Sequence, residues 1–301
     1  MQKIVSIFIT AITASLAGYI PGASAQQSLR QQIAAISEHI PGKVGVFVKV
    51  LETGDTVSLR RDDHFPMQSV YKFPVSIAIL QQVDAGKMRL DQPMKILKSD
   101  LTTDGHSPLR QKYPEGNVTL TLQELLDYNM RESDGSACDI LFKLLGGPAK
   151  VNAAIHQLGV KQIAISTTEE AQVQKTDQRA QYTNWCTPAA MTQLLETFYI
   201  KPVLSDSSRS YLLYLMTSST PGAKRLKGLL PAGTEVAHKT GTSWTIDGLT
   251  AAHNDAGIIT LPDGKHIAVT VFVSDTSAGD DDRDGTIAKI ARAVWDTYTH
   301  Q

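Results

Sequence analysis

The chain has 301 residues, enough for one large domain or two modest ones. Its composition, 42% hydrophobic and 20% charged residues, is ordinary for a globular protein, and its net charge is only -1. Because there is neither a charge excess nor a local run of Lys and Arg, nothing favours nucleic acid or anionic lipid as a partner. We therefore expect a small-molecule substrate or ligand.

The N-terminus has the pattern of a cleaved export signal. Lys3 makes a short positive segment, and residues 4–16 are apolar apart from Thr and Ser. The Ala-Ser-Ala of residues 23–25 is the small-x-small pattern that signal peptidase recognises, which predicts cleavage between Ala25 and Gln26. The apolar run is short for a membrane span, and no Cys follows for a lipid anchor. We expect a secreted, periplasmic protein without a membrane anchor.

Two cysteines, Cys138 and Cys186, bear on disulfide and metal chemistry. They could pair in an exported chain, but Cys138 lies in an apolar helical pattern, where a free Cys behaves as a small core residue. We expect two separate buried thiols, although the sequence does not exclude a bridge. The eight His residues form no ligand-like cluster with each other or with these thiols, so we expect no metal and no cofactor.

In chain order, the predicted elements begin with a helix and a hairpin. Residues 28–40 have apolar side chains at helical spacing, residues 43–51 alternate as a strand does, and residues 56–60 can return beside them. The middle of the chain is mostly helical in pattern. Its predicted helices span residues 71–85, 121–130, 136–145, 149–158, 187–199 and 208–218.

Strand patterns return after residue 235. Residues 256–261 and 266–274 flank a turn and predict a hairpin, and residues 286–298 predict a closing helix. Strands from both ends of the chain are therefore expected to join one antiparallel sheet, flanked by the terminal helices, with an all-helical domain inserted. The fold class is α+β.

The predicted boundaries follow from this layout. They place a signal peptide at 1–25, a discontinuous sheet domain at 26–66 and 221–301, and a helical domain at 67–220. The cleft between the two domains is the expected place for chemistry.

Three short motifs contain residues suited to serine chemistry. Ser69 and Lys72 form an S-x-x-K tetrad at a helix start, so they share a face, and a Lys there can activate a serine hydroxyl. Ser133-Asp134-Gly135 can present a hydroxyl while its Asp caps the following helix. The third motif, Lys239-Thr240-Gly241-Thr242-Ser243, has the pattern of a strand edge that binds an extended acyl substrate and its carboxylate.

Taken singly, each motif also fits an ordinary surface serine, a helix cap or an edge strand. Together, in this order, S-x-x-K, S-D-x and K-T-G are the signature set of class A β-lactamases and penicillin-binding proteins. The chain resembles this superfamily over its mature length, most closely the PER-like branch of class A. The resemblance implies the two-part serine β-lactamase fold and a monomer that hydrolyses the β-lactam amide bond through an acyl-enzyme, which confers antibiotic resistance.

The resemblance also implies roles for individual residues. Ser69 is the expected nucleophile, with the backbone N–H groups of Ser69 and Thr242 as oxyanion hole. Ser133 relays a proton to the leaving nitrogen, which Lys239 polarises. Lys72, the loop Glu, or that Glu through a water takes the Ser69 proton. The residues expected to bind substrate are Thr240, Gly241, Thr242, Ser243, Arg225, His106 and Gly135.

A glutamate in the loop before residue 185 is expected to activate the deacylating water. By resemblance this base is Glu170, with Glu169 as the neighbouring alternative, while two solvated loop carboxylates are the competing interpretation. Most class A members carry Asn four residues beyond this Glu, and here Gln174 stands at that place.

Three of the expected substrate contacts are less typical. His106 matches a position where an aromatic side chain often forms a cleft wall, although a solvated loop His fits equally well. Arg225 lies 14 residues before Lys239, where some members place an Arg for the substrate carboxylate, and a surface Arg is the alternative. Gly135 replaces the usual Asn of S-D-N and offers no amide.

Two other functions share these motifs. A D-Ala-D-Ala carboxypeptidase would lack the loop Glu, and a non-hydrolysing penicillin-binding sensor would stay acylated, usually beside a membrane segment that this chain does not show. A zinc β-lactamase is disfavoured because the His residues are not clustered.

Overall fold

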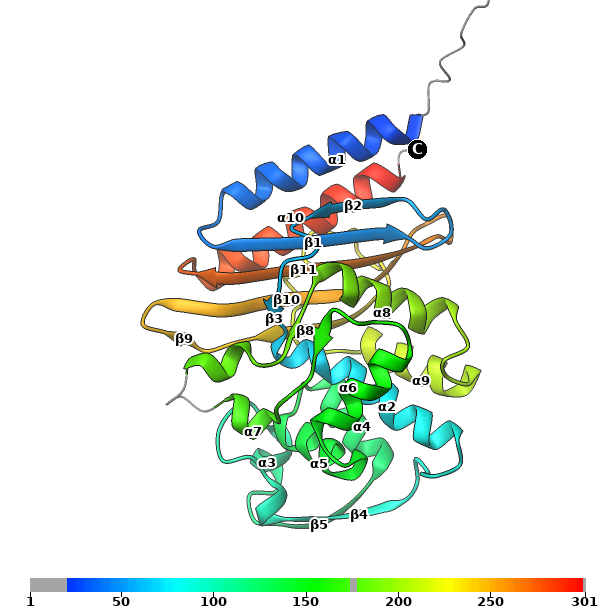
Figure 1. The fold of residues 1–301 in the computed structure, drawn as a ribbon, viewed down its shortest axis with the longest axis vertical. Helices are drawn as coiled ribbons and strands as arrows, with labels where there is room; N and C mark the ends of the chain where they lie inside the picture. Colours follow the sequence, from blue (N-terminus) through cyan, green and yellow to red (C-terminus); the bar gives the residue numbers. More distant parts are fainter. Residues whose placement is uncertain (1–20, 174–177, 300–301) are drawn as a thin grey trace, which may run out of the picture.

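The computed structural model describes residues 21–173 and 178–299 as a sheet part stacked on a helical part (Figure 1). The large sheet is antiparallel, with strand order β2-β1-β11-β10-β8, and a short β9 pairs with β10. One antiparallel sheet built from both ends of the chain is thus confirmed. Its strands are β1 (Lys43–Val50), β2 (Thr56–Leu59), β8 (Val236–Thr242), β9 (Thr245–Ile246), β10 (Leu249–Thr260) and β11 (His266–Thr276).

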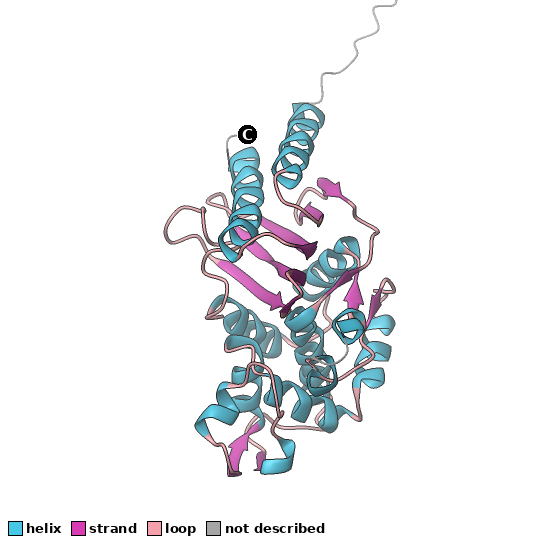
Figure 2. Ribbon diagram, turned by 90° about the vertical axis from the view of Figure 1, so that its left-hand side faces the viewer, coloured by secondary structure: helices cyan, strands magenta, loops and turns pink. Residues whose placement is uncertain are grey.

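Helices α1 (Pro21–Glu38) and α10 (Asp280–Thr299) cover one face of this sheet (Figures 1 and 2). Leu29 of α1 and Val294 of α10 are fully buried in one core with alternate residues of β1, such as Val46. The predicted closing helix begins six residues too late. Its true first turn holds three aspartates, which stabilise a helix N-terminus but carry no apolar periodicity.

The other face of the sheet rests on the helical part. All six helices predicted there are confirmed to within two residues at each end. These six are α2 (Lys72–Asp84), α4 (Leu122–Arg131), α5 (Gly135–Leu145), α6 (Pro148–Gln157), α8 (Pro188–Ile200) and α9 (Asp206–Thr217). Two short helices, α3 (Pro108–Lys112) and α7 (Glu169–Gln172), were not predicted. Short 3-10 turns join them: η1 (Gln68–Tyr71), η2 (Lys98–Asp100) and η3 (Gln178–Tyr182).

The inserted part is not purely helical, which corrects the expectation. A hairpin of β4 (Pro93–Leu97) and β5 (Gly116–Thr121) lies at its far end, and β3 (Phe65–Pro66), β7 (Trp185–Cys186) and β6 (Ile163–Ala164) form a small sheet. The two strands of the hairpin are short and mostly exposed, and the strands of the small sheet are only two residues long. Neither kind therefore leaves a clear alternation of apolar and polar residues in the sequence. The domain boundaries at residues 66/67 and 220/221 stay a prediction.

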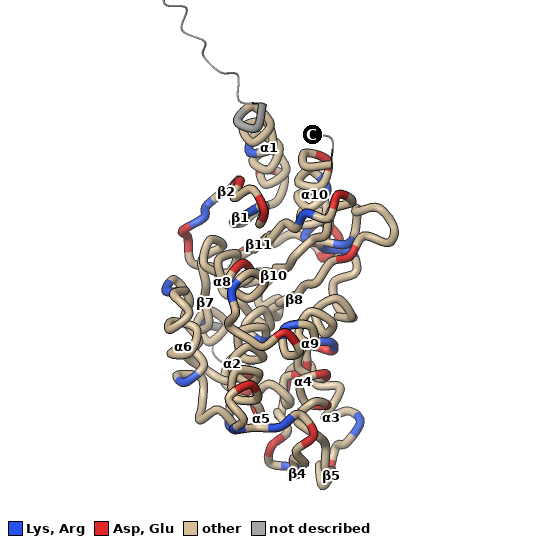
Figure 3. Tube along the Cα trace, turned by 90° about the vertical axis from the view of Figure 1, so that its right-hand side faces the viewer, with Lys and Arg blue, Asp and Glu red and all other residues tan. Residues whose placement is uncertain are grey.

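Two further expectations concern the cysteines and the leader. Cys138 and Cys186 are both buried free thiols, which confirms the expectation of two separate buried cysteines. Most of the predicted signal peptide, residues 1–20, lies outside the described residues, and the predicted cleavage point falls within α1. Among the described residues, no helix combines the length and apolarity needed to span a membrane. In the view of Figure 3, Lys and Arg are interspersed with Asp and Glu along the described residues.

Leu29→Ala should lower the free energy of unfolding by about 2–5 kcal/mol, because it opens a cavity between α1 and the sheet. Leu229→Ala is the matched control, since that side chain is 47% exposed, and it should change stability by about 0.5 kcal/mol or less. Denaturant unfolding followed by circular dichroism measures both. Equal losses in the two variants would contradict the packing of α1 on the sheet.

Candidate active site

Ser69 lies where the helical part meets the sheet, in the turn η1 that leads into α2. Two buried asparagines fix the strand segment just before it. The side-chain Nδ2 of Asn254 donates to the backbone carbonyl oxygens of Pro66 (2.7 Å) and Met67 (3.2 Å). The Met67 N–H in turn donates to the backbone carbonyl oxygen of Asn184 at 2.9 Å. The Ser69 backbone is therefore tied to the sheet on one side and to the loop before α8 on the other.

Lys72 connects Ser69 to a loop carboxylate. Its side chain has no solvent exposure, and its Nζ donates to Ser69 Oγ at 2.8 Å and to Glu169 Oε2 at 3.0 Å. Burial alone disfavours the charge on Lys72, but the adjacent Glu169 carboxylate outweighs it and raises the Lys72 pKa above its ordinary value. The resting site therefore holds a buried ammonium paired with Glu169.

The carboxylate beside Lys72 is Glu169 and not Glu170, which corrects the expectation by one residue. Glu170 turns to the other side of the loop, where it accepts hydrogen bonds from the Thr103 N–H at 2.7 Å and from the Thr103 hydroxyl. Successive residues of a helical turn point about 100° apart, so only one of two adjacent carboxylates can face Ser69. Gln174 lies outside the described residues.

Asp139 of α5 holds the backbone that carries both glutamates. Its carboxylate accepts the N–H of Glu169 at 2.7 Å and that of Glu170 at 2.8 Å, while Thr168 caps the same turn. Burial raises the pKa of Asp139 to about 6 despite these hydrogen bonds. Sequence reasoning missed Asp139, although a carboxylate within the apolar pattern of α5 was a usable signal.

Ser133 and Lys239 meet on the opposite side of the site. Lys239 Nζ donates to Ser133 Oγ and to the Thr240 carbonyl, both at 2.9 Å. Burial first, and the nearby charge of Lys72 second, lower the pKa of Lys239 well below its ordinary value. Asp134 caps α5 by accepting the Ala137 N–H at 2.8 Å, as the motif predicted.

Strand β8 runs directly against the Ser69 turn. A Cβ atom on Gly241 would lie 2.2 Å from the Met67 carbonyl oxygen, so a side chain there cannot fit without moving the backbone. Arg225, only 8% exposed, lies behind the strand and donates from Nη2 to Thr242 Oγ1 at 2.6 Å. The Thr240 side chain is buried, and its methyl group faces Gly222 rather than the cavity beside Ser69.

A cavity of about 210 Å³ brings several predicted residues together, namely Ser69, His106, Thr242 and Ser243, with Glu169. Its lining also includes Gln68, Gly105, Gln172, Val173, Gln181 and Trp244, which sequence reasoning did not single out. His106 is exposed, and its Nε2 lies 2.9 Å from the Glu132 carbonyl oxygen.

Gly135 leaves space that Glu169 occupies, because a Cβ at residue 135 would lie 2.9 Å from Glu169 Cγ. The usual Asn of this motif would therefore press on the Glu169 side chain.

Comparison with known proteins agrees with this geometry. A profile of the β-lactamase enzyme family matches residues 28–298. The chain is 40% identical over 261 residues to β-lactamase VEB-1 of Pseudomonas aeruginosa, covering 86% of each protein. It is 37% identical over 297 residues to extended-spectrum β-lactamase PER-1 of the same organism, covering 98% of this chain and 96% of that protein.

Solved structures give the same result. A β-lactamase from Chitinophaga pinensis is 50% identical, with a TM-score of 0.87, and the match covers 90% of this chain and 99% of that one. The chain is a class A β-lactamase. TLA-3 extended-spectrum β-lactamase, 45% identical, matches with a TM-score of 0.88 over 91% of this chain and 99% of that one. The expected PER-like branch is confirmed, and with it a serine hydrolase of β-lactam antibiotics.

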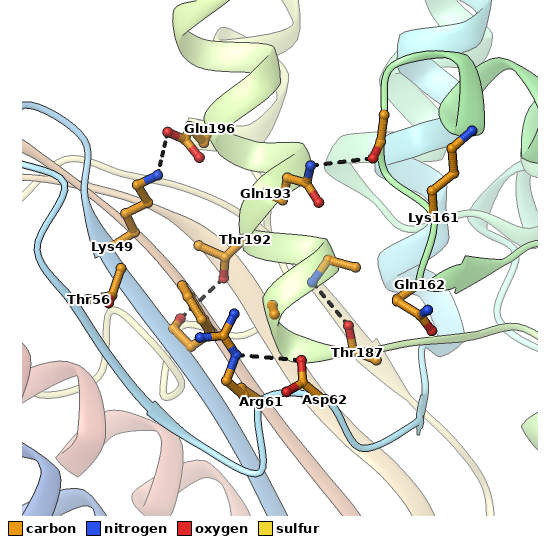
Figure 4. A pocket seen from close by; sticks show the side chains of 14 residues that line it. Lys49, Thr56, Arg61, Asp62, Lys161, Gln162, Thr187, Thr192, Gln193 and Glu196 are labelled. Carbon is orange, nitrogen blue, oxygen red and sulfur yellow. Dashed lines mark hydrogen bonds and ion pairs between the residues drawn. The ribbon is translucent and has the colours of Figure 1, made fainter.

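A larger cavity of this β-lactamase, about 460 Å³, lies between β1 and the first turns of α8 (Figure 4). None of its lining residues belongs to the cavity beside Ser69. Its charged side chains largely neutralise one another, as in the pairs Lys49–Glu196 at 2.7 Å and Arg61–Asp62 at 3.5 Å. The larger of these two cavities is therefore not the one that contains the motif residues.

Gly241→Ala should reduce kcat/KM of the β-lactamase at least about a hundredfold, because β8 must move away from the Ser69 turn and misplace the oxyanion site. Gly279→Ala is the matched control, since a Cβ there meets no atom within 4 Å. Steady-state hydrolysis of a chromogenic cephalosporin measures both. Near-normal activity of Gly241→Ala would refute the close approach of β8 to Met67.

His253 of the β-lactamase links pH to stability. It lies behind β8 with Nε2 2.7 Å from Asp284 Oδ1, and burial, with the charge of Arg225, lowers its pKa from 6.5 to about 4. Protonation therefore favours the unfolded chain, and the stability that neutral His253 supplies is lost as pH falls from 6.5 towards 4.

His253→Gln can keep the hydrogen bond to Asp284 but cannot titrate. Its melting temperature should fall less than that of the wild type when the pH is lowered from about 7 to about 5. Thermal unfolding at a series of pH values provides the comparison. Parallel declines would mean that another group controls this dependence.

Proposed function

We propose that this β-lactamase uses Ser69 as nucleophile and Glu169 as the general base for both half-reactions. The observation that supports the proposal is the contact chain from Ser69 Oγ to Lys72 Nζ to Glu169 Oε2, at 2.8 and 3.0 Å. Burial disfavours the charge on Lys72, but Glu169 raises the Lys72 pKa, which favours the ammonium form and makes Lys72 a poor acceptor for the serine proton while Glu169 is beside it. Glu169 is the adjacent group that can accept it, through a water.

In acylation, Ser69 Oγ forms a bond to the lactam carbonyl carbon and its proton passes to Glu169. The backbone N–H groups of Ser69 and Thr242 stabilise the developing oxyanion. The amide C–N bond then breaks, and Ser133 gives its proton to the nitrogen. Lys239 donates to Ser133 Oγ and can replace that proton, which suits an amine whose pKa burial has lowered.

Before deacylation, Glu169 releases to solvent the proton that it took from Ser69, and Lys239 regains a proton from solvent. The Glu169 carboxylate then removes a proton from a water that attacks the acyl carbon. The bond from that carbon to Ser69 Oγ breaks, and the proton returns to the serine. A carboxylate in contact with the Lys72–Ser69 pair favours a hydrolase over an acylated sensor or a carboxypeptidase, since neither rival needs a base at this place.

The substrate carboxylate is assigned to the far end of the cavity. A substrate carboxylate there would favour the charged form of the buried Lys239 amine, and Arg225 adds a positive charge behind Thr242. We assign the substrate contacts to Thr242, Ser243 and His106, which line the cavity, and to the backbone of Thr240 and Gly241.

We also propose that the enzyme is a periplasmic monomer whose leader is removed between Ala25 and Gln26. The leader pattern of the first 25 residues supports export. The proposal of a monomer rests on the resemblance to class A β-lactamases.

Glu169→Gln should acylate and then stall. Without the Glu169 charge, burial lowers the Lys72 pKa, so neutral Lys72 can accept the Ser69 proton, whereas no group remains to activate the deacylating water. Intact-protein mass spectrometry should then find a penicilloyl adduct that persists for hours. Glu170→Gln is the matched control and should turn over within a few-fold of the wild type, because Glu170 faces Thr103. Ser69→Ala should form no adduct. Normal turnover by Glu169→Gln, or an adduct that survives in Ser69→Ala, would overturn the assignment.

A further inference from the structure

Tyr71 is the one polar residue of the Ser69–Lys72 tetrad to which the mechanism above gives no task. Its side chain is completely buried, yet its hydroxyl reaches Glu169 and donates a short hydrogen bond to Oε2. Lys72 Nζ contacts the same oxygen at 3.0 Å. Two donors from one helix start therefore converge on a single oxygen of the proposed base.

The Tyr71 hydroxyl is a fixed and permanently protonated donor. Burial, followed by the charge of Glu169, raises the pKa of Tyr71 well above its ordinary value of 10.0, so the phenol does not ionise where the enzyme works. The ring packs beside Phe142, with ring centroids 5.9 Å apart. A buried, packed ring cannot swing away, so the direction of its O–H group is set by the core.

This arrangement divides the two oxygens of Glu169 between different tasks. Within the described part of the chain, both side-chain hydrogen bonds that Glu169 accepts fall on Oε2. Oε1 keeps its lone pairs for a water in the adjoining cavity, which Glu169 lines.

The residue four places beyond Glu169 gives the carboxylate no polar support. It is Val173, an apolar side chain that lines the same cavity and cannot hydrogen-bond to the carboxylate. The hydroxyl of Tyr71 is thus an additional polar contact that orients the base.

We propose that Tyr71 is a positioning residue for deacylation, which holds the Glu169 carboxylate so that Oε1 faces the hydrolytic water. The proposal rests on the proposed role of Glu169. A donor to an ionised carboxylate favours the ionised form, so Tyr71 also keeps the base active at lower pH. Acylation depends less on Tyr71, because Lys72 contacts Ser69 Oγ directly and can accept its proton when the Glu169 carboxylate is displaced, whereas in deacylation only Glu169 can activate the water.

Tyr71→Phe removes the hydroxyl and keeps the ring. Stopped-flow burst kinetics with a chromogenic cephalosporin should show a deacylation rate about tenfold lower, with acylation changed less than threefold. The acidic limb of the deacylation pH profile should move to higher pH. The matched control is Tyr298→Phe, which removes another buried hydroxyl from α10 on the far face of the sheet and should leave both rates and the profile unchanged.

The double variant Tyr71→Phe/Glu169→Gln separates this proposal from the assignment of the base. If Tyr71 acts through the carboxylate, Tyr71→Phe should not slow the residual deacylation of Glu169→Gln any further, as followed by mass spectrometry. Normal turnover by Glu169→Gln alone would overturn the assignment of the base. If Glu169→Gln traps the adduct, an unchanged pH profile in Tyr71→Phe, or an equal loss in both backgrounds, would overturn the role of Tyr71.

Discussion

A lysine ammonium with no solvent exposure is the constraint on which the rest of this site depends. A buried unpaired charge costs several kcal/mol, so Lys72 requires an anion within contact distance. That anion is Glu169, which belongs to a loop with little regular structure of its own. The loop must therefore be held by other groups, and Asp139 and Asn184 bind its backbone on either side. The contacts that hold this loop therefore also fix the carboxylate that pairs with Lys72 beside Ser69.

A second buried lysine completes this arrangement from the sheet. Lys239 and Lys72 approach Ser69 from different parts of the chain, and the charge of Lys72 disfavours a charge on Lys239. Both lysines contact a serine hydroxyl, but the second contact of Lys72 is a carboxylate, whereas that of Lys239 is a carbonyl oxygen. In the proposed substrate complex, a substrate carboxylate would add a negative charge on this side of the site. That charge would favour the ammonium form of Lys239.

Much of this could be predicted from the sequence because it depends on local patterns. Apolar periodicity located the six inner helices, and motif spacing predicted the contacts of Ser69 with Lys72 and of Ser133 with Lys239. The choice between Glu169 and Glu170 could not be predicted, since it depends on which residue of one short turn faces α2. Asp139 and Tyr71 were missed for a related reason. Each sits in an apolar pattern that looks like core, and only tertiary packing shows what its polar group contacts.

The order of strands in the large sheet has a consequence for how the enzyme folds. Strand β1 pairs with the central strand β11, for example Val50 with Ile267, so the sheet closes only after most of the chain has been made. Pairings this distant in sequence form slowly, because loop-closure entropy must be overcome first. A partly folded chain can already form α2 and the turn that carries Ser69, yet it lacks a completed sheet with the K-T-G residues of β8 in place. Hydrolytic competence is therefore among the last properties that the folding chain acquires, and its appearance reports the completed topology.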